Sequence, residues 1–307
     1  MSDAPGPKLR RRPRRMLVLG GAIVAVAAGV AVAVAQGSGH KGASTAATAS
    51  ASLGAAAAAT GTTVTPPPKK KTPPTPAVNP ATQRQIRRMI AANAIFIRGG
   101  TRGRLVALTF DDGPSIYTPR LVRELRQLKA PATFFEIGSQ IHRYSTLVAN
   151  MTKFGFPIED HTWNHPDLTR LSSTQVQGQL LWTKNAIFKA THVYPQFFRP
   201  PYGAQNAHVR HAAGGLGMAT TVWSIDTRDW SRPGTSAIIH AAEQVRAGGI
   251  VLMHDGGGNR SATLAAVRVV VRYLRAHGYT LVTVPQLLTI APPKLSTRWL
   301  SAAHGGG

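Results

Sequence analysis

The chain of 307 residues contains no cysteine, so it can form no disulfide and no metal site with thiolate ligands. Any transition-metal site must therefore be built from His, Asp or Glu side chains. Acidic residues are also scarce, at 12 against 36 Lys and Arg. Eleven of the 12 acids lie between residues 111 and 255, and the sequence shows no internal repeat.

The formal net charge of +24 is spread unevenly along the chain. Residues 1–103 carry 15 Lys and Arg against one acid, whereas residues 104–290 carry 19 against 11. The basic residues form no patch interleaved with aromatic residues, as a nucleic-acid surface would require. A solvated basic stalk beside an anionic envelope is therefore favoured, and we expect no nucleic-acid partner.

The amino terminus resembles an export signal or a membrane anchor. Residues 1–15 are basic, and residues 16–35 contain no charged side chain. Twenty such residues can span a bilayer, and the positive-inside rule places the basic segment in the cytoplasm. The alternative is a secretory signal peptide cleaved after the small residues Ala33-Val34-Ala35. We expect either a single-pass membrane protein with everything after residue 35 outside the cell, or a secreted protein.

Two segments separate this region from the predicted domain. Residues 36–80 are rich in Ala, Thr and Pro and cannot bury a core, so they indicate a linker. Residues 81–103 predict a short helical lead-in, over 82–98, that ends before Gly99-Gly100. The apolar face of this helix consists of Ile86, Met89, Ile90, Ala94 and Ile97.

Residues 104–290 alternate short apolar runs with amphipathic segments, which predicts one α/β domain, followed by a tail over 291–307. Continuous apolarity is typical of strands buried on both faces of a parallel sheet. The predicted strands cover residues 105–110, 132–137, 217–225, 250–253 and 280–284, with weaker candidates at 156–158 and 197–199. One predicted helix begins with Thr118 as its cap and Pro119 in its first turn. Three others are predicted over 173–189, 235–246 and 261–276.

Parallel β/α folds place active sites at the carboxyl ends of their strands, so chemically active side chains should follow the apolar runs. Five polar clusters do so in the sequence. They are Asp111-Asp112, His161 with His165, Arg199 with Tyr202, Asp229 with Trp230, and Leu252 with His254.

His161 and His165 are four residues apart, a spacing that places both rings on one side of a helical turn. Two imidazoles and one carboxylate leave coordination positions of a divalent ion open. No Glu lies between the two, so the zincin motif is not met. Asp111-Asp112 then have two interpretations. Either the pair caps a turn, or Asp112 binds the metal while Asp111 takes a proton from water.

Three further side chains have structural as well as functional interpretations. Arg199 and Asp229 form either surface ion pairs or contacts that orient catalytic groups. His254 is a packed residue after a buried strand unless an acid such as Asp229 keeps it protonated for general acid catalysis.

The five motifs together resemble the polysaccharide deacetylases, whose domain is called the NodB homology domain or carbohydrate esterase family 4. They are Thr-Phe-Asp-Asp-Gly-Pro, His-Thr-x-x-His, Arg-x-Pro-Tyr, Asp-x-x-Asp-Trp and Leu-x-His, within residues 104–290. The resemblance implies a distorted (β/α) barrel and metal-dependent hydrolysis of acetyl groups on a glycan. One departure is Glu159-Asp160 before His161, where the family often has Gly-Asn.

The resemblance also implies a role for each matching residue. Asp112, His161 and His165 would bind the divalent metal, usually zinc, with cobalt and other ions as alternatives. Asp111 would be the base, oriented by Arg199, and His254 the general acid, tuned by Asp229. The backbone amide of Tyr202 would help to hold the oxyanion, while Trp230 and Leu252 would line a pocket for the acetyl methyl group.

The expected function is N-deacetylation of a cell-wall glycan, peptidoglycan above all, by a monomeric enzyme tethered to the membrane through residues 16–35. An acetylxylan or O-acetyl polysaccharide esterase fits the same motifs. A glycan-binding module without activity and an iron oxygenase with two His and one carboxylate are alternatives from other classes.

Overall fold

The computed structural model describes residues 79–294. The predicted basic segment, membrane segment, most of the linker and all but the first residues of the tail lie outside the described residues. Within residues 79–294, every helix is too short or too polar to cross a membrane.

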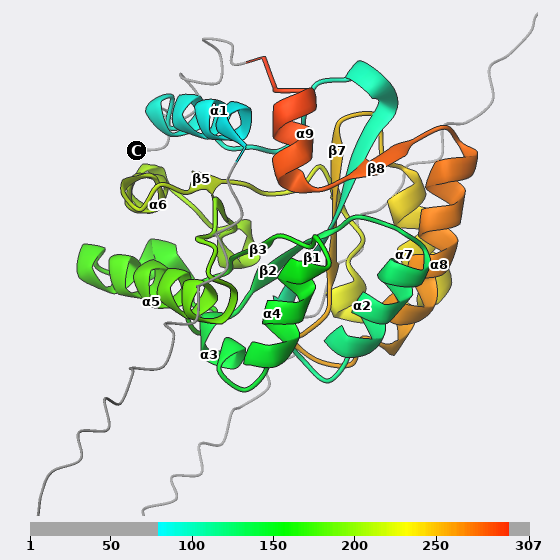
Figure 1. Ribbon diagram of the computed structural model, residues 1–307, viewed down its shortest axis with the longest axis horizontal. Coiled ribbons are helices and arrows are strands. Elements are labelled where there is room, and N and C mark those ends of the chain that lie inside the picture. Colours follow the sequence, from blue (N-terminus) through cyan, green and yellow to red (C-terminus); the bar gives the residue numbers. More distant parts are fainter. Residues whose placement is uncertain (1–78, 295–307) are drawn as a thin grey trace, which may run out of the picture. The chain divides into compact units, whose positions relative to one another are not determined.

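The fold is built on one sheet of parallel strands with the order β5-β4-β3-β2-β1-β7-β6, in which β8 also pairs with β1 (Figure 1). The strands are β1 Leu105–Gly113, β2 Thr133–Glu136, β3 Ile158–Asp160, β4 Phe197–Phe198, β5 Ala219–Thr220, β6 Ile225–Asp226, β7 Gly249–His254 and β8 Thr280–Val282. Strand β1 has β7 on one side, and β8 and β2 along successive parts of the other. The predicted parallel α/β class is confirmed.

The sheet curls like an incomplete barrel. Strands β5 and β6 are at opposite ends of the sheet order, yet Thr220 and Ile225 are only five residues apart, at most roughly 18 Å of chain. Phe96 and Arg98 lie in the opening between these edges, because they form isolated bridges to Thr221 and Gly249. The expected distorted barrel is therefore present as a curled half-barrel.

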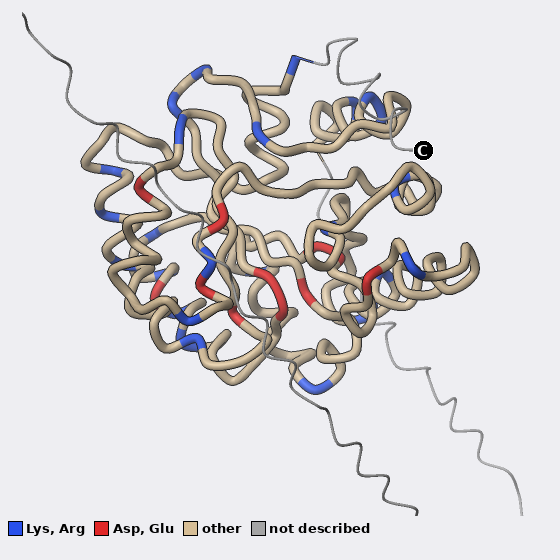
Figure 2. The backbone as a smooth tube through the Cα atoms, turned by 180° about the vertical axis from the view of Figure 1, so that it is seen from behind, with Lys and Arg blue, Asp and Glu red and all other residues tan. Residues whose placement is uncertain are grey.

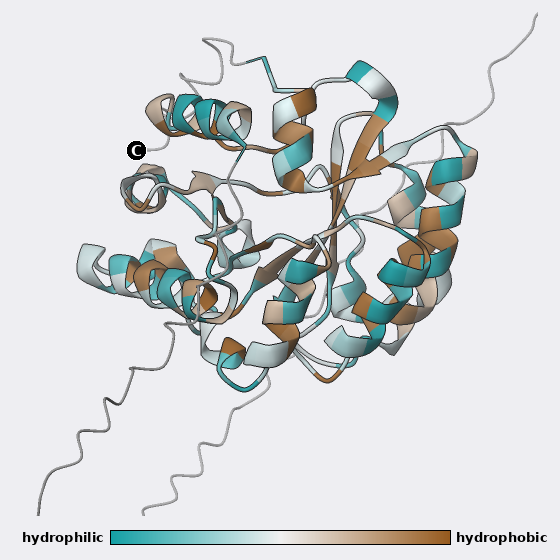
Figure 3. Ribbon diagram, in the orientation of Figure 1, coloured by the Kyte–Doolittle hydropathy of each residue, from teal (hydrophilic) through white to brown (hydrophobic). Residues whose placement is uncertain are grey.

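Helices cover both faces of the sheet, which explains the continuous apolarity of β1. Val106, Leu108 and Phe110 pack in a core with residues of α2, α4, α7 and α8. Leu105 and Ala107 point the other way, into a core that includes α1 and α9. The strands are accordingly the most apolar part of the domain (Figure 3). The helices are α1 Pro80–Ala91, α2 Thr118–Gln127, α3 Gly138–Ile141, α4 Ser145–Lys153, α5 Ser173–Thr191, α6 Ala207–Gly215, α7 Thr235–Glu243, α8 Ser261–Ala276 and α9 Val284–Ile290.

Two predictions about element boundaries were wrong. The helix expected over 82–98 ends at Ala91, because Asn93 is left-handed (φ 46°) and Phe96 continues as extended chain into a buried bridge. Ile86 and Met89 are buried on its inner face, whereas Ile97 belongs to the segment after the helix. The strand expected over 217–225 is instead the two short strands β5 and β6, because the chain crosses from one edge of the sheet to the other between them.

Thr118 does not cap its helix as expected, because its hydroxyl is engaged elsewhere. Thr118 is the first residue of α2, and its Oγ1 accepts the backbone N–H of Ser115 at 2.8 Å. The same oxygen donates to Asp255 Oδ2 at 2.5 Å. Thr118 therefore ties the start of α2 to the loop that follows β7.

Candidate active site

The five polar clusters lie together at the carboxyl ends of the strands, as predicted. Asp111 and Asp112 are in the last part of β1, and His254 ends β7 opposite Asp111 in the parallel register. His161 directly follows β3, and Arg199 directly follows β4. Acidic residues gather in the interior near these strand ends, while most Lys and Arg residues lie on the surrounding helices and loops (Figure 2).

A pocket of about 400 Å³ opens at this edge of the sheet. Eight of the ten predicted site residues line it, and the other two, Arg199 and Asp229, lie behind its wall in contact with residues that do. The eight are Asp111, Asp112, His161, His165, Tyr202, Trp230, Leu252 and His254.

The end of β1 explains how two consecutive carboxylates serve one site. Successive side chains of a regular strand point to opposite faces of the sheet. Here Asp112 has a left-handed backbone (φ 71°), and the register with β2 slips between Asp111 and Gly113. Both carboxylates therefore approach the same ring, because Asp111 Oδ2 is 3.9 Å and Asp112 Oδ1 is 3.4 Å from His161 Nε2.

Gly256 makes this turn sterically possible. A Cβ atom at Gly256 would lie 1.9 Å from the backbone oxygen of Asp112. Only glycine lets the loop after β7 approach the Asp112 turn this closely.

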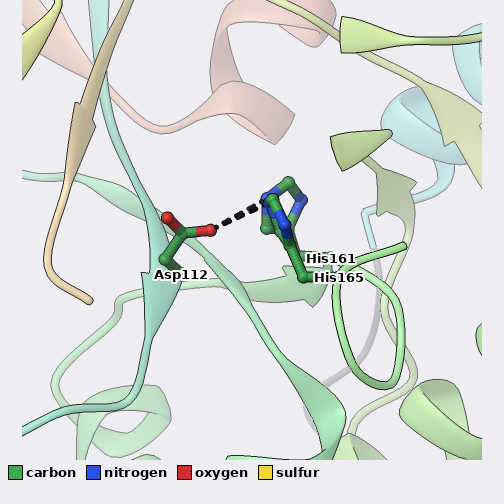
Figure 4. Close-up of side chains that lie close together, drawn as sticks. All are labelled: Asp112, His161 and His165. Atoms are coloured by element: carbon green, nitrogen blue, oxygen red, sulfur yellow. Dashed lines mark ion pairs between the residues drawn. The ribbon is translucent and has the colours of Figure 1, made fainter. Parts of the chain in front are cut away.

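Asp112, His161 and His165 are arranged as a metal site (Figure 4). One potential ligand atom of each residue lies within 4.8 Å of the others, and Asp112 Oδ1 is 3.2 Å from His165 Nε2. Asp112 Oδ1 is buried and has no hydrogen-bond partner among the described residues. A buried, unpaired carboxylate oxygen that faces two imidazole nitrogens fits a divalent cation.

The tautomer of His161 supports the same interpretation. Its Nδ1 lies 2.8 Å from the backbone oxygen of Arg199. A carbonyl oxygen only accepts, so Nδ1 carries a proton, and in the neutral ring Nε2 then presents its lone pair towards Asp112. This is the state that a metal ligand requires.

The protonation states also fit cation binding. Burial alone would raise the pKa of Asp112, but its interaction with His161 and the nearby charges of His254 and His165 outweigh burial, and the pKa is lowered well below its usual value. Burial lowers the pKa of His165, and the neighbouring His161 lowers it further. A charged carboxylate and a neutral imidazole are the forms in which Asp112 and His165 would bind a divalent ion.

Arg199 holds Asp111 in a fixed orientation. Its Nη1 donates to Asp111 Oδ1 at 2.6 Å and to Thr109 Oγ1 at 2.8 Å. Both charged side chains are buried, with Arg199 0% and Asp111 2% exposed, so this is not the surface ion pair that was the alternative. The guanidinium also stacks over the ring of Phe135, 3.9 Å from its centroid. Asp111 Oδ2 remains directed towards the metal site.

His254 is paired with Asp229 on another wall of the pocket. Its Nδ1 lies 2.6 Å from Asp229 Oδ1, and Asp229 Oδ2 accepts the backbone N–H of His254 and the hydroxyl of Thr263. Burial alone would lower the pKa of His254, but the hydrogen bond and charge of Asp229 outweigh burial and raise it. His254 is therefore a buried imidazole whose protonated form is stabilised by a carboxylate, which distinguishes it from a packed histidine.

Apolar and aromatic side chains complete the pocket. Leu252 is buried, whereas Trp230 is 48% and Tyr202 71% exposed at its mouth. The Tyr202 ring packs edge-on against His165, with 4.7 Å between centroids.

Five further residues line the same pocket, and the sequence assigned no role to any of them: Pro200, Trp223, Asp226, Gly257 and Arg260. Asp226 is the first residue of the Asp-x-x-Asp-Trp motif. Trp223 was counted as part of a strand, and no motif marked Arg260. Arg260 is buried and donates to the backbone oxygens of Gly256 and Asp229, which links the loop after β7 to the loop that carries Asp229.

The two acids that depart from the family pattern bind backbone N–H groups. Glu159 Oε2 accepts the backbone N–H groups of Gln196 and Phe197 at 2.7 and 2.8 Å. Its complete burial raises its pKa to about 8, although these two hydrogen bonds act in the opposite sense. Asp160 Oδ1 accepts the N–H of Thr162 at 2.8 Å. Glu159 therefore supports the backbone at the start of β4, whereas Asp160 supports the backbone between the two histidines.

Comparison with known proteins agrees with this geometry. A family described as polysaccharide deacetylase matches residues 98–221. A peptidoglycan-N-acetylglucosamine deacetylase of Bacillus cereus is 41% identical over 60% of this chain and 88% of its own length. A chitooligosaccharide deacetylase of Rhizobium leguminosarum bv. trifolii is 36% identical over 65% of this chain and 99% of its own length. A family 4 carbohydrate esterase from Streptomyces lividans, solved with acetate, superposes with a TM-score of 0.57 at 34% identity, over 61% of this chain and 96% of its own.

Proposed function

Because the chain belongs to the polysaccharide deacetylase family and is a polysaccharide deacetylase, we propose that it removes N-acetyl groups from N-acetylglucosamine in peptidoglycan with the help of a divalent metal ion. The observation that carries this proposal is that two buried ion pairs and one three-residue cluster meet at one pocket. These are Asp111 held by Arg199, His254 held by Asp229, and the Asp112–His161–His165 cluster between them.

Asp112, His161 and His165 would hold the metal, which we take to be zinc because imidazole and carboxylate ligands suit it. A divalent ion here would lower the pKa of a water molecule and polarise the acetyl carbonyl group. Asp111 Oδ2 would accept the proton of the attacking water, because Arg199 occupies the other oxygen.

His254 would donate a proton to the nitrogen of the leaving amino sugar. Collapse of the tetrahedral centre requires protonation of the sugar nitrogen, and Asp229 favours the protonated form of His254 that this step needs. Its Nε2 is free to donate because Nδ1 faces Asp229. Trp230 and Leu252 would enclose the acetyl methyl group, and the backbone N–H of Tyr202 would help to hold the oxyanion. Acetate and a free amino sugar would result.

The choice of peptidoglycan rests on two observations. The Bacillus cereus relative named for that substrate is 41% identical. The basic, apolar amino terminus also supports an exported domain that stays on the cell's own envelope, either anchored or secreted. Chitooligosaccharides are the second candidate substrate, because the Rhizobium relative is named for them.

Acetate release tests the proposal directly. The protein, supplied with Zn²⁺ or Co²⁺, is incubated with peptidoglycan, N-acetylglucosamine oligomers and acetylated xylan, and free acetate is measured. Release from peptidoglycan above the other two is expected. Release from xylan alone would replace the proposal with an esterase function, and no release from any substrate would refute it.

Asp229→Asn should narrow the range of pH over which the enzyme works. A general acid must be protonated, so activity is lost as pH rises through the pKa of His254, and Asp229 raises that pKa. The variant lacks the charge, so the alkaline limb of kcat/KM should move to lower pH. The acidic limb should stay in place. An unchanged alkaline limb would contradict the role of His254 as the acid.

A further inference from the structure

A second pocket adjoins the active site, and the proposed chemistry makes no use of it. This flanking pocket measures about 470 Å³ and is lined by residues within 115–117 and 139–144 and by Gly258. Gly258 directly follows Gly257, which lines the active-site pocket. Gln140, in the wall of the flanking pocket, donates through Nε2 to the backbone oxygen of Asp112 at 3.3 Å. The two pockets therefore meet at the Asp112 turn.

The distance between the pockets suits neighbouring units of one glycan. Ser115 lines the flanking pocket and lies three residues after Asp112, at most roughly 11 Å of chain. A sugar placed with its acetyl group beside Asp112 leaves the adjoining sugar, or a substituent on it, next to the flanking pocket. The flanking pocket thus faces a part of the substrate that does not react.

Charged side chains line both pockets, but only the active-site pocket holds charges of both signs, because Arg260 lines it as well as acids. Three carboxylates, those of Asp111, Asp112 and Asp226, line the active-site pocket. No acid lines the flanking pocket, where Arg143 is the only charged side chain. An anionic substituent is therefore favoured in the flanking pocket, where no acid opposes the charge of Arg143.

Arg143 is available to bind such a substituent. It lies between α3 and α4 and is exposed. Within residues 79–294 no carboxylate lies within ion-pair distance of it, and its contact is with the ring of Tyr144, 5.8 Å from the centroid. A guanidinium offers donors in a planar fork that matches a carboxylate. The exposed Ser139 hydroxyl and the partly buried Tyr117 ring add a polar contact and a stacking surface.

We propose that the flanking pocket binds a carboxylate-bearing substituent on the sugar next to the one that loses its acetyl group, and that Arg143 recognises this carboxylate. This inference rests on the proposed function. In peptidoglycan the neighbouring sugar is a muramic acid that carries a peptide with free carboxylates, whereas chitooligosaccharides are uncharged. Arg143 then makes the enzyme prefer peptidoglycan over chitin.

The inference is tested by removing the charge of Arg143 and the charge of the substrate carboxylates, separately and together. Acetate release is measured on glycan strands with their peptides, on the same strands with the carboxylates amidated, and on chitooligosaccharides. For the wild type, amidation should lower kcat/KM about tenfold, the size of one charge-assisted contact. Arg143→Gln should show that lower value on both kinds of strand and match the wild type on chitooligosaccharides. Arg272→Gln, at an exposed site on α8, is the matched control and should behave like the wild type.

The outcomes separate this inference from the proposed function. Equal loss on all three substrates, or no loss on any, would overturn the role of Arg143. If the wild type deacetylates only chitooligosaccharides, the peptidoglycan proposal fails instead. The assignment of the flanking pocket is then tested separately, by measuring the binding of a carboxylate-bearing ligand. A muramyl peptide, titrated calorimetrically, should bind about tenfold more weakly to Arg143→Gln than to the wild type. Equal affinities, or no binding to either protein, would refute the pocket assignment.

Discussion

Asp111→Asn should lower kcat for acetate release by about 10²–10⁴-fold, the usual contribution of a general base. Asparagine has the same shape, and its Oδ1 can still accept from Arg199 Nη1, which is 2.6 Å from the present carboxylate oxygen. The amide cannot take up a proton from water. The loss should therefore appear in kcat, while KM changes little.

Two further measurements separate this effect from a damaged site. The metal content of Asp111→Asn should equal that of the wild type, because Asp111 lies outside the Asp112–His161–His165 cluster. Glu243→Gln removes a carboxylate on α7, outside the pocket, and should leave kcat within about twofold, as a surface change does. A fully metal-loaded Asp111→Asn with more than a tenth of wild-type kcat would contradict the assignment of the base.

The position of the site could be predicted from the sequence because it depends on the order of the strands. Buried strands such as β1 and β7 are continuously apolar, so their ends are visible as the points where polar residues follow. In a parallel sheet these ends meet at one edge. This brings Asp111 opposite His254, although 142 residues separate them in the chain.

The local geometry of the site could not be predicted in this way. Alternation along a strand would have sent Asp111 and Asp112 to opposite faces, and only the left-handed backbone of Asp112 prevents this. The direction of the Glu159 side chain could not be predicted from the sequence either. Glu159 lies two residues before His161, but its carboxylate accepts the backbone N–H groups of Gln196 and Phe197 at the start of β4. Arg143 belongs to no motif, so its significance depends on a pocket that only the fold reveals.

Helix boundaries failed for a related reason. The apolar spacing of residues 82–98 is compatible with one helix, but burying Phe96 between β5 and the core requires extended chain there. Tertiary packing thus overrode a weak local preference. The same applies to β5 and β6, because the strand predicted over 217–225 ran across the four residues that separate them.

Removal of the metal should abolish activity, and Asp112→Asn should prevent its return. After treatment with a chelator, wild-type activity should recover on addition of Zn²⁺ or Co²⁺. Asp112 Oδ1 is the buried oxygen that faces both imidazoles, at 3.4 and 3.2 Å, so the variant loses the only charged ligand of the cluster. At the same metal concentration, its kcat/KM should be lower by about 10²–10³-fold, as when one electrostatic stabiliser of a transition state is lost.

Asparagine is the informative replacement at this position because the backbone of Asp112 is left-handed (φ 71°), a conformation that Asn tolerates better than Ala. The fold should therefore survive, which unfolding by denaturant can verify. Binding of Co²⁺, followed by its visible absorption, gives a readout independent of catalysis. Weak Co²⁺ binding with a wild-type unfolding midpoint would assign Asp112 as a ligand. Wild-type Co²⁺ affinity in the variant would instead show that Asp112 serves the turn alone, the other interpretation of this acidic pair.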